Sequence, residues 1–167
     1  KTKRALGGDF AQTPRYQGAG SSAVNSTKVD TLLDMISETD LALVGFEPGF
    51  ERHGGENASK RDAAVDLAKR AAVVLLCLGL DEIAESEGAD RLSMLINDNQ
   101  KQLIKAVAAV NPNVVVLLSA GSSVETGWTS DAKAVVYCAL GGQAGAGAAL
   151  DVVAGKVNPS GKLTETW

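Results

Sequence analysis

The sequence is organised around an apolar run of strand length that ends at a glycine, Val73-Val74-Leu75-Leu76-Cys77-Leu78-Gly79-Leu80. An acidic segment follows directly, Asp81-Glu82-Ile83-Ala84-Glu85-Ser86-Glu87-Gly88-Ala89-Asp90-Arg91. Open α/β sheets place ligands and chemistry at the carboxyl ends of their buried strands. Glu85 and Glu87 alternate with Ser86, so an extended backbone would point both carboxylates the same way. Taken alone, however, such an acidic loop is also what a solvated connection looks like.

The rest of the chain alternates between strand and helix patterns. Continuous apolar runs or alternating polarity predict strands at 3–8, 41–46, 73–79, 114–118, 134–140 and 162–167. Apolar residues at helical spacing predict helices at 27–36, at 59–70 and from Asp98 up to the Asn111-Pro112-Asn113 stop. Small residues at 143–154 predict a further helix, and Ser59 is the expected N-cap of the second one.

This order predicts a three-layer α/β/α sandwich of the flavodoxin-like kind. Strands that are apolar throughout and alternate with helices are typical of a mainly parallel sheet covered on both faces. Right-handed crossovers then place the helices in two layers. We expect about six strands, with the alternating segment 162–167 at the edge of the sheet. Residues 1–167 form a single domain of ordinary size.

Composition narrows the class of protein. Apolar residues make up 45% and charged residues 22%, which is globular composition, and a net charge of −4 argues against a nucleic-acid partner. No run of about 18 apolar residues and no signal-peptide pattern is present, so no membrane partner is expected and the cytoplasm is slightly favoured. The abrupt start at Lys1 and the end just after a strand-like segment suggest a fragment.

Several other candidate sites are weaker. The segment 18–23 fits G-x-G-x-x-A but does not follow a strand directly, as a dinucleotide loop must. The glycines of 141–147 open a helix and could cradle an anion, although close helix packing explains them better. His53 is the only histidine and lies in a polar loop with nothing to orient it, so neither a histidine-rich metal site nor a Ser-His-Asp arrangement is expected. Cys77 and Cys138 read as buried structural thiols.

Five segments in register resemble the C-terminal sandwich domain of glycoside hydrolase family 3, the β-glucosidase-like enzymes. The acidic segment resembles a motif of that family, especially Glu85-Ser86-Glu87-Gly88-Ala89-Asp90-Arg91 followed by Asn99-Gln100. The other four are Pro14-Arg15-Tyr16-Gln17-Gly18-Ala19-Gly20-Ser21-Ser22, Val110-Asn111-Pro112-Asn113, Gly141-Gly142-Gln143-Ala144-Gly145 and Val157-Asn158-Pro159-Ser160-Gly161-Lys162-Leu163-Thr164-Glu165-Thr166. The resemblance covers nearly the whole chain.

The resemblance implies an exo-acting β-glycosidase with a retaining mechanism, in which a (β/α)8 barrel domain, absent from these residues, carries the nucleophilic aspartate. This domain would supply the acid/base glutamate, which maps to Glu87, with Glu85 as the alternative. Asp90 and Arg91 would brace the loop as an ion pair. The 11–22 loop would line the same rim, and its candidate substrate-binding residues are Arg15, Gly18, Gly20 and Ser21.

The expected partners follow from that mechanism. They are the barrel domain of the same protein and a β-glycoside or oligosaccharide substrate. Neither a cofactor nor a metal ion is expected. The alternative function is a non-catalytic, flavodoxin-like ligand-binding or interaction module that uses the Gly18–Ser22 loop.

Overall fold

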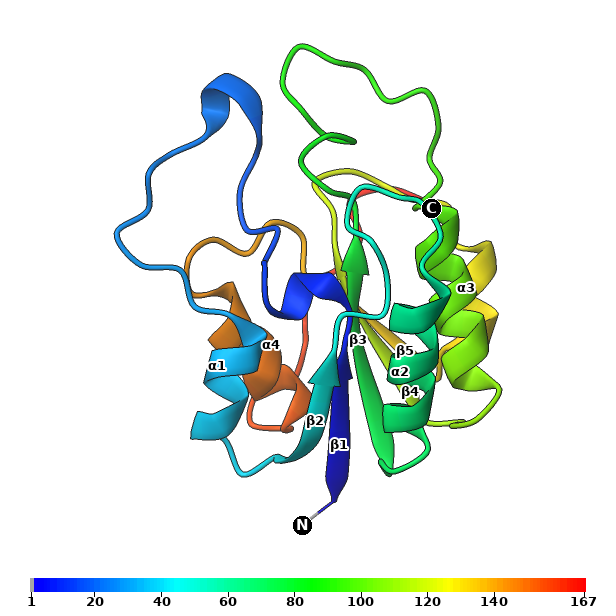
Figure 1. The fold of residues 1–167 in the computed structure, drawn as a ribbon. Helices are drawn as coiled ribbons and strands as arrows, with labels where there is room; N and C mark the ends of the chain where they lie inside the picture. Colours follow the sequence, from blue (N-terminus) through cyan, green and yellow to red (C-terminus); the bar gives the residue numbers. More distant parts are fainter. Residues whose placement is uncertain (1) are drawn as a thin grey trace.

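The protein is built on a five-stranded, all-parallel sheet, as a computed structural model that describes residues 2–167 shows (Figure 1). The strands lie in the order β2-β1-β3-β4-β5. Their bounds are Lys3–Gly7 for β1, Ala42–Glu47 for β2, Val73–Gly79 for β3, Val114–Ser119 for β4 and Ala134–Tyr137 for β5. Because all neighbouring strands are parallel, their carboxyl ends meet at one edge of the sheet.

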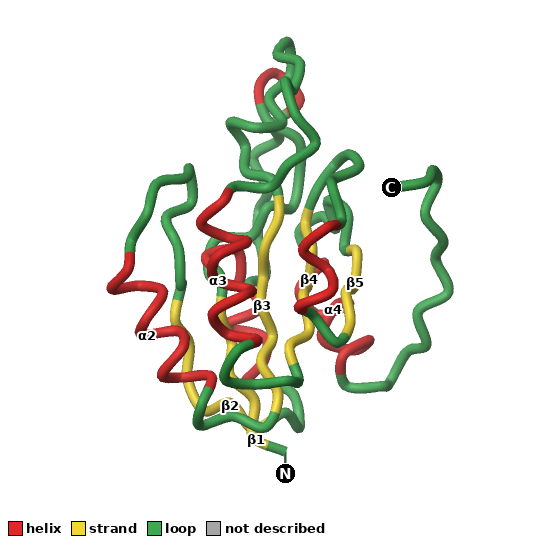
Figure 2. The backbone as a smooth tube through the Cα atoms, turned by 90° about the vertical axis from the view of Figure 1, so that its right-hand side faces the viewer, coloured by secondary structure: helices red, strands yellow, loops and turns green. Residues whose placement is uncertain are grey.

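Helices cover both faces of the sheet. They are α1 (Leu32–Met35), α2 (Ala58–Ala68), α3 (Asp98–Ala108) and α4 (Gly145–Val153), with 3-10 turns η1 (Asp9–Ala11), η2 (Gly20–Ser22), η3 (Ile36–Glu38) and η4 (Gly127–Asp131). In Figure 1, α1 and α4 lie on one side and α2 and α3 on the other; Figure 2 shows the second pair in front of the strands. The three-layer α/β sandwich predicted from the sequence is confirmed.

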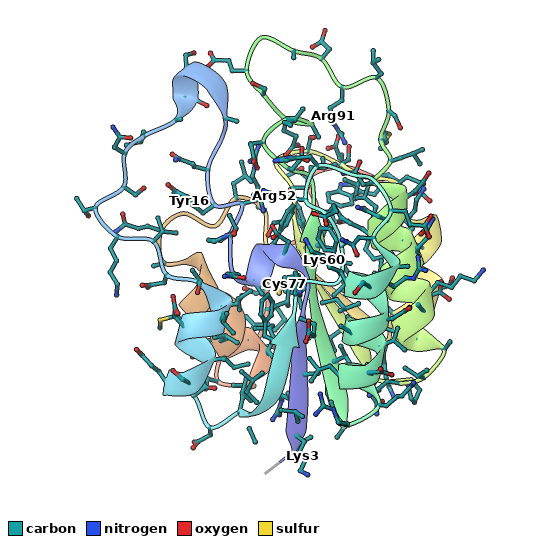
Figure 3. The ribbon with its side chains drawn as sticks, viewed as in Figure 1. Lys3, Tyr16, Arg52, Lys60, Cys77 and Arg91 are labelled. Carbon is teal, nitrogen blue, oxygen red and sulfur yellow. The ribbon has the colours of Figure 1, made fainter. Side chains whose placement is uncertain are left out.

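The central strand β3 divides its side chains between two cores. Leu76 and Leu78 pack in the cluster under α2 and α3, whereas Leu75 and Cys77 pack in the cluster under α1 and α4. All four are essentially inaccessible to solvent, which explains why this strand reads as a continuous apolar run. Cys77, labelled in Figure 3, is a buried core residue, whereas Cys138 is partly buried and packs against the same cluster. Burial raises the pKa of both thiols, that of Cys138 to about 11.

The expected sixth strand does not form, so the prediction of about six strands is wrong. Residues 162–167 pair with no strand, and the edge is occupied by the four-residue β5. Figure 2 shows the tail running beside the sheet as an irregular segment. The Trp167 ring packs edge-on against Tyr137 with centroids 4.7 Å apart. A side-chain contact therefore holds the tail end, and alternating polarity alone does not create backbone pairing.

Two helix starts also differ from expectation. The segment predicted to be helical at 27–36 becomes helical only at Leu32, where the Thr31 hydroxyl accepts a hydrogen bond from Asp34 N at 3.0 Å. Helix α2 is capped by Asn57, whose side chain accepts from Lys60 N at 3.0 Å, and Ser59 lies inside it. In both cases the cap is the residue whose side chain the backbone path brings to the first free N–H groups of the helix. None of the helices within residues 2–167 is long and apolar enough to cross a membrane.

Candidate active site

Two long loops leave the carboxyl edge of the sheet and meet above it. One follows β1 and covers residues 8–31; the other follows β3 and covers residues 80–97, and both rise to the top of Figure 1. Ala19 and Ser86 form an isolated parallel bridge between the loops, and Glu87 N donates to Ala19 O at 3.1 Å. The first loop therefore lies directly against the acidic segment.

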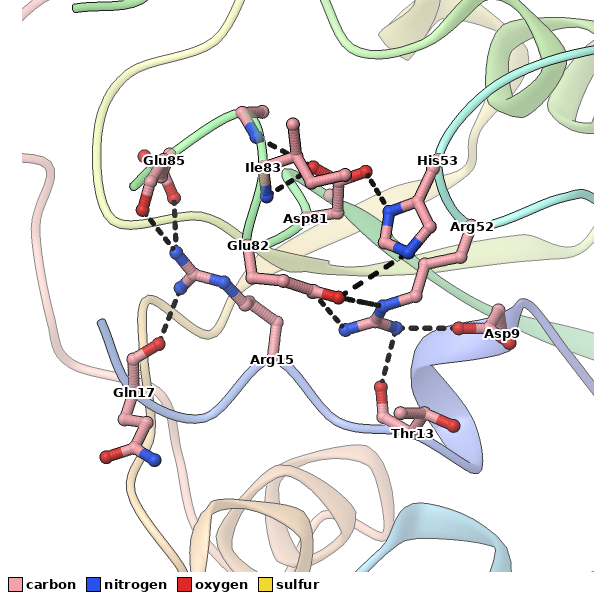
Figure 4. Close-up of polar contacts among 12 residues, drawn as sticks. Asp9, Thr13, Arg15, Gln17, Arg52, His53, Asp81, Glu82, Ile83 and Glu85 are labelled. Carbon is pink, nitrogen blue, oxygen red and sulfur yellow. Dashed lines mark hydrogen bonds and ion pairs between the residues drawn. The ribbon is translucent and has the colours of Figure 1, made fainter. Parts of the chain in front are cut away.

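The acidic segment begins with a tight turn that the side chain of Asp81 stabilises. This buried carboxylate accepts hydrogen bonds from Ile83 N at 3.0 Å and Ala84 N at 2.8 Å. Its second oxygen accepts from Nδ1 of His53 at 3.0 Å, so the expectation that nothing orients this histidine is wrong (Figure 4). Because the chain turns over 82–85, Glu85 and Glu87 reach different partners, and an extended backbone does not aim them together.

Arg52 ties the same turn to the segment that follows β1. Its guanidinium contacts Asp9 Oδ2 at 2.6 Å and Thr13 O at 2.9 Å on one side, and Glu82 Oε2 at 2.9 Å on the other (Figure 4). It also lies 4.5 Å from the centroid of the Phe10 ring. Partial burial opposes ionisation of Glu82, but the hydrogen bonds and charge of Arg52 outweigh it and lower the pKa of that carboxyl.

Glu85 points inward, and protein groups occupy both of its carboxylate oxygens. Gly121 N donates to Oε2 at 2.8 Å, and the Ser122 hydroxyl donates to Oε1. The guanidinium of Arg15 lies 3.7 Å from Oε2 and also donates to the main-chain oxygen of Glu85 at 3.0 Å. The side chains of Arg15 and Glu85 are 4% and 11% exposed. Arg15 therefore lies beneath the rim on which it was expected.

Glu87 differs from Glu85 because its side chain is exposed, although both residues border the same open groove. The Ser21 hydroxyl donates to its Oε2, while none of the residues described in 2–167 donates to Oε1. The groove is about 630 Å³ and is lined by Gly18, Ala19, Ser22, Ala84, Glu85, Ser86, Glu87, Ala89, Asp90, Arg91 and Ser122. Gly20 packs on the other side of Glu87: a Cβ at Gly20 would stand 2.9 Å from Glu87 Cβ. The structure thus gathers Gly18, Gly20 and Ser21 around Glu87.

Arg91 braces the loop, but not through Asp90. Its Nη2 donates to Ser123 O at 2.6 Å, and within 2–167 no ion pair joins it to Asp90. Asp90 is exposed, whereas Arg91, labelled in Figure 3, is partly buried, and its Nη1 is inaccessible to solvent. The expected ion pair is therefore absent, and Arg91 joins the acidic loop to the connection that follows β4.

Gln100 is a residue of this region whose role sequence reasoning missed. It lies in the first turn of α3, is fully buried, and exchanges two hydrogen bonds of 2.9 Å with the backbone of Gly79. Gly79 is the last residue of β3, so Gln100 fixes the point where the acidic loop begins. A glutamine in the first turn of a helix beside an otherwise apolar stripe was the available signal.

The remaining glycine-rich candidate is a packing feature of the described structure. Gly142 N donates to Tyr16 O at 2.9 Å, and Gln143 O accepts from Asp30 N at 2.9 Å. These bonds fasten the start of α4 to the first loop, over a cavity of only about 50 Å³.

Fold and site together define a doubly wound α/β domain that presents carboxylate-bearing loops at the carboxyl edge of its sheet. The chain belongs to glycoside hydrolase family 3, because residues 1–167 match the family described as Glycosyl hydrolase family 3 C-terminal domain. The resemblance drawn from the sequence motifs is thereby confirmed.

Individual relatives agree with this assignment. An exo-α-(1→6)-L-arabinopyranosidase of Bifidobacterium breve is 44% identical over 98% of this chain and 22% of its own length. The thermostable β-glucosidase B of Acetivibrio thermocellus is 43% identical over the same shares, 98% and 22%. A crystal structure of a family 3 β-glucosidase from Bifidobacterium adolescentis superposes with a TM-score of 0.93 at 46% identity, covering 99% of this chain and 24% of that one. The chain thus spans about a fifth of the length of the curated relatives it matches.

Proposed function

We propose that this chain is the C-terminal domain of a longer, exo-acting β-glycosidase that hydrolyses terminal non-reducing sugars with retention of configuration. A (β/α)8 barrel domain of the same protein would carry the nucleophilic aspartate, and this domain would lend the acid/base residue, Glu87. Two relatives named as glycosidases support the reaction class, and both are several times longer than this chain.

The observation that carries the assignment of Glu87 is the contrast between the two glutamates. A retaining glycosidase needs a proton donor about 5–5.5 Å from the nucleophile, facing the sugar. Gly121 and Ser122 each donate to one oxygen of Glu85, and Arg15 lies close to it, so the protein itself holds this side chain on both oxygens. Glu87 borders the groove, is held on one oxygen by Ser21, and keeps the other oxygen for proton transfer.

Docking of a barrel over the groove would complete the chemistry. A carboxyl group that is removed from water favours its neutral, proton-donating form. The bond between Ser21 and Glu87 would then fix the orientation of the donor, because the exposed loop by itself leaves the side-chain torsions free.

A flavodoxin-like binding module is the weaker alternative. The strand order 2-1-3-4-5 is the one that binds flavin at the crevice between β1 and β3. Here η1 packs on β3 at that place, and Phe10 and Ala11 are 2% and 0% exposed, so side chains fill the crevice. A flavin titration of the chain should show no binding; saturable binding would revive this alternative.

The decisive experiment is Glu87→Ala in the full-length enzyme, with Glu85→Ala beside it. We expect kcat/KM for an alkyl β-glycoside to fall about 10²–10⁴-fold in Glu87→Ala, with a much smaller loss on a 2,4-dinitrophenyl glycoside whose leaving group needs no proton. Azide should accelerate this variant on the activated substrate and give a β-glycosyl azide. Azide rescue confined to Glu85→Ala would move the role to Glu85. Turnover by residues 1–167 alone would contradict a shared active site.

A further inference from the structure

The carboxylate of Glu85 is a junction of three loops that follow three adjacent strands. Arg15 comes from the loop after β1, Glu85 from the loop after β3, and Gly121 and Ser122 from the segment after β4. Their contacts with the carboxylate are the 2.8 Å bond from Gly121 N, the bond from the Ser122 hydroxyl, and the 3.7 Å ion pair with Arg15. A carboxylate that is an acceptor on both oxygens is well suited to hold loops together.

Arg15 spaces two of these loops with its planar guanidinium. Nη1 donates to Gln17 O at 2.6 Å, and Nη2 donates to Glu85 O at 3.0 Å (Figure 4). The side chain is 4% exposed, so water does not compete for these bonds. The rigid fork of arginine fixes two acceptors at a set separation, which the single ammonium of lysine cannot do.

The two acceptors stand at equal distances along the chain from the contact that holds Glu87. Gln17 precedes Ala19 by two residues, and Glu85 precedes Glu87 by two. Ala19 O accepts from Glu87 N at 3.1 Å, and Ser21 on the next turn holds the Glu87 carboxylate. Arg15 therefore sets how segments 17–19 and 85–87 align, just before the contacts that hold Glu87.

We propose that Arg15 and Glu85 form a clamp, further secured by Ser122, whose function is to position Glu87. The inference rests on the proposed function, because it takes Glu87 as the proton donor. Glu85 is then a positioning residue and not a second acid, and Arg15 acts on the loops and not on the sugar. Breaking the clamp displaces Glu87 but leaves its carboxyl group chemically intact.

If Glu87 is displaced, kcat/KM should fall selectively for substrates whose leaving group must be protonated. We would measure kcat/KM for an alkyl and a 2,4-dinitrophenyl β-glycoside with full-length Glu85→Gln and Arg15→Met. A misplacement of about 1 Å can cost on the order of 10²-fold, so we expect a tenfold to hundredfold loss on the alkyl substrate. The loss on the dinitrophenyl substrate should stay within about threefold, because protonation contributes little there. Ser122→Ala should show the same selectivity to a smaller extent.

Arg52→Met is the matched control. Its guanidinium is also shielded, with the side chain 14% exposed, and it also ties the acidic turn to the first loop, but it contacts neither Gln17 nor Glu85. A change that only loosens the domain should lower kcat/KM equally for both substrates, and we expect that pattern for Arg52→Met. In the double variant of Arg15→Met with Glu85→Gln, the selectivity should be no greater than in the stronger single variant, because both changes open one clamp.

Two results would overturn the clamp. Equal losses on both substrates in Arg15→Met and Glu85→Gln would show a merely structural role, and azide rescue of Glu85→Gln would show that Glu85 is itself the donor. If Arg15→Met does not fold, Glu85→Gln, which keeps the volume of the side chain, still decides the question. The proposed function is tested separately by Glu87→Gln: absence of leaving-group selectivity there refutes it, whereas selectivity there without any in the clamp variants refutes the clamp alone.

Discussion

Replacing Gln100 by leucine tests how strongly the core controls the start of the acidic loop. The amide of Gln100 is fully buried and satisfies both the N–H and the carbonyl of Gly79, each at 2.9 Å. Leucine has a similar volume and forms neither bond. Both backbone groups of Gly79 then stay buried without these partners, at the end of the central strand β3.

The expected cost follows from these two lost bonds. A buried backbone group left without a partner costs about 1–3 kcal/mol, so two give about 2–6 kcal/mol. The added apolar burial of leucine offsets part of this, on the order of 1 kcal/mol. We therefore expect a loss of about 3 kcal/mol in the free energy of unfolding, which corresponds to a fall in Tm of about 6–12 °C for a domain of this size.

Urea unfolding of the chain, followed by far-UV circular dichroism, measures this loss. Gln102→Leu is the control, because Gln102 lies on the same helix, is exposed, and has a single contact at 3.1 Å with the Arg61 guanidinium. Its effect should stay within about 0.5 kcal/mol, as is usual for surface positions. A loss below about 1 kcal/mol for Gln100→Leu, with an unchanged m-value, would refute the argument, since it would mean that Gly79 does not depend on this amide.

Two further predictions concern the loops. Gly20 and Gly88 have φ of 84° and 79°, so alanine at either position should lower the free energy of unfolding in urea by about 1 kcal/mol. Only alanine at Gly20 meets Glu87, so only Gly20→Ala should also lower turnover of alkyl glycosides by the full-length enzyme. Equal turnover by the two variants would contradict this packing of Gly20 against Glu87. The pKa of Glu82 is lower in the folded chain than in the unfolded chain. Its pairing with Arg52 therefore stabilises the fold at pH values above the pKa of the unfolded chain, and this stabilisation is lost as the pH falls through the pKa of the folded chain. Glu82→Gln should thus be less stable than the parent at pH 7, by under about 1 kcal/mol, with a difference that shrinks below about pH 4; a difference independent of pH would refute the role of this charge.

The main architecture could be predicted because buried strands and helices show up in the sequence as short apolar runs or periodic apolar patterns. The strands β3 and β4 are apolar on both faces, and glycines or the Asn111-Pro112-Asn113 stop bound them, so their positions were predicted closely. Helix α3 begins at Asp98 as expected. The tail 162–167 was mispredicted because alternating polarity reports which side chains could face a core, and not whether a partner strand is present.

The candidate site was only partly predictable. Sequence alone placed several carboxylates after the central strand, and the family resemblance pointed to Glu87 with Glu85 as its alternative. It could not show that Glu85 is held by Arg15 and Ser122, which lie 70 and 37 residues away along the chain. Nor could it show that Asp81 orients His53, or that Arg91 reaches Ser123 and not Asp90.

The sequence by itself thus determined the order of strands and helices and the edge of the sheet where the acidic loop emerges, because these depend on periodicity within short segments. Only the tertiary structure decided which carboxylate is exposed with one oxygen free of protein donors and which one is held on both oxygens by distant loops. The parallel strands bring their carboxyl ends together, and this arrangement sets which residues of distant loops come within hydrogen-bonding distance of Glu85 and of Glu87. The different roles of the two carboxylates follow from those contacts.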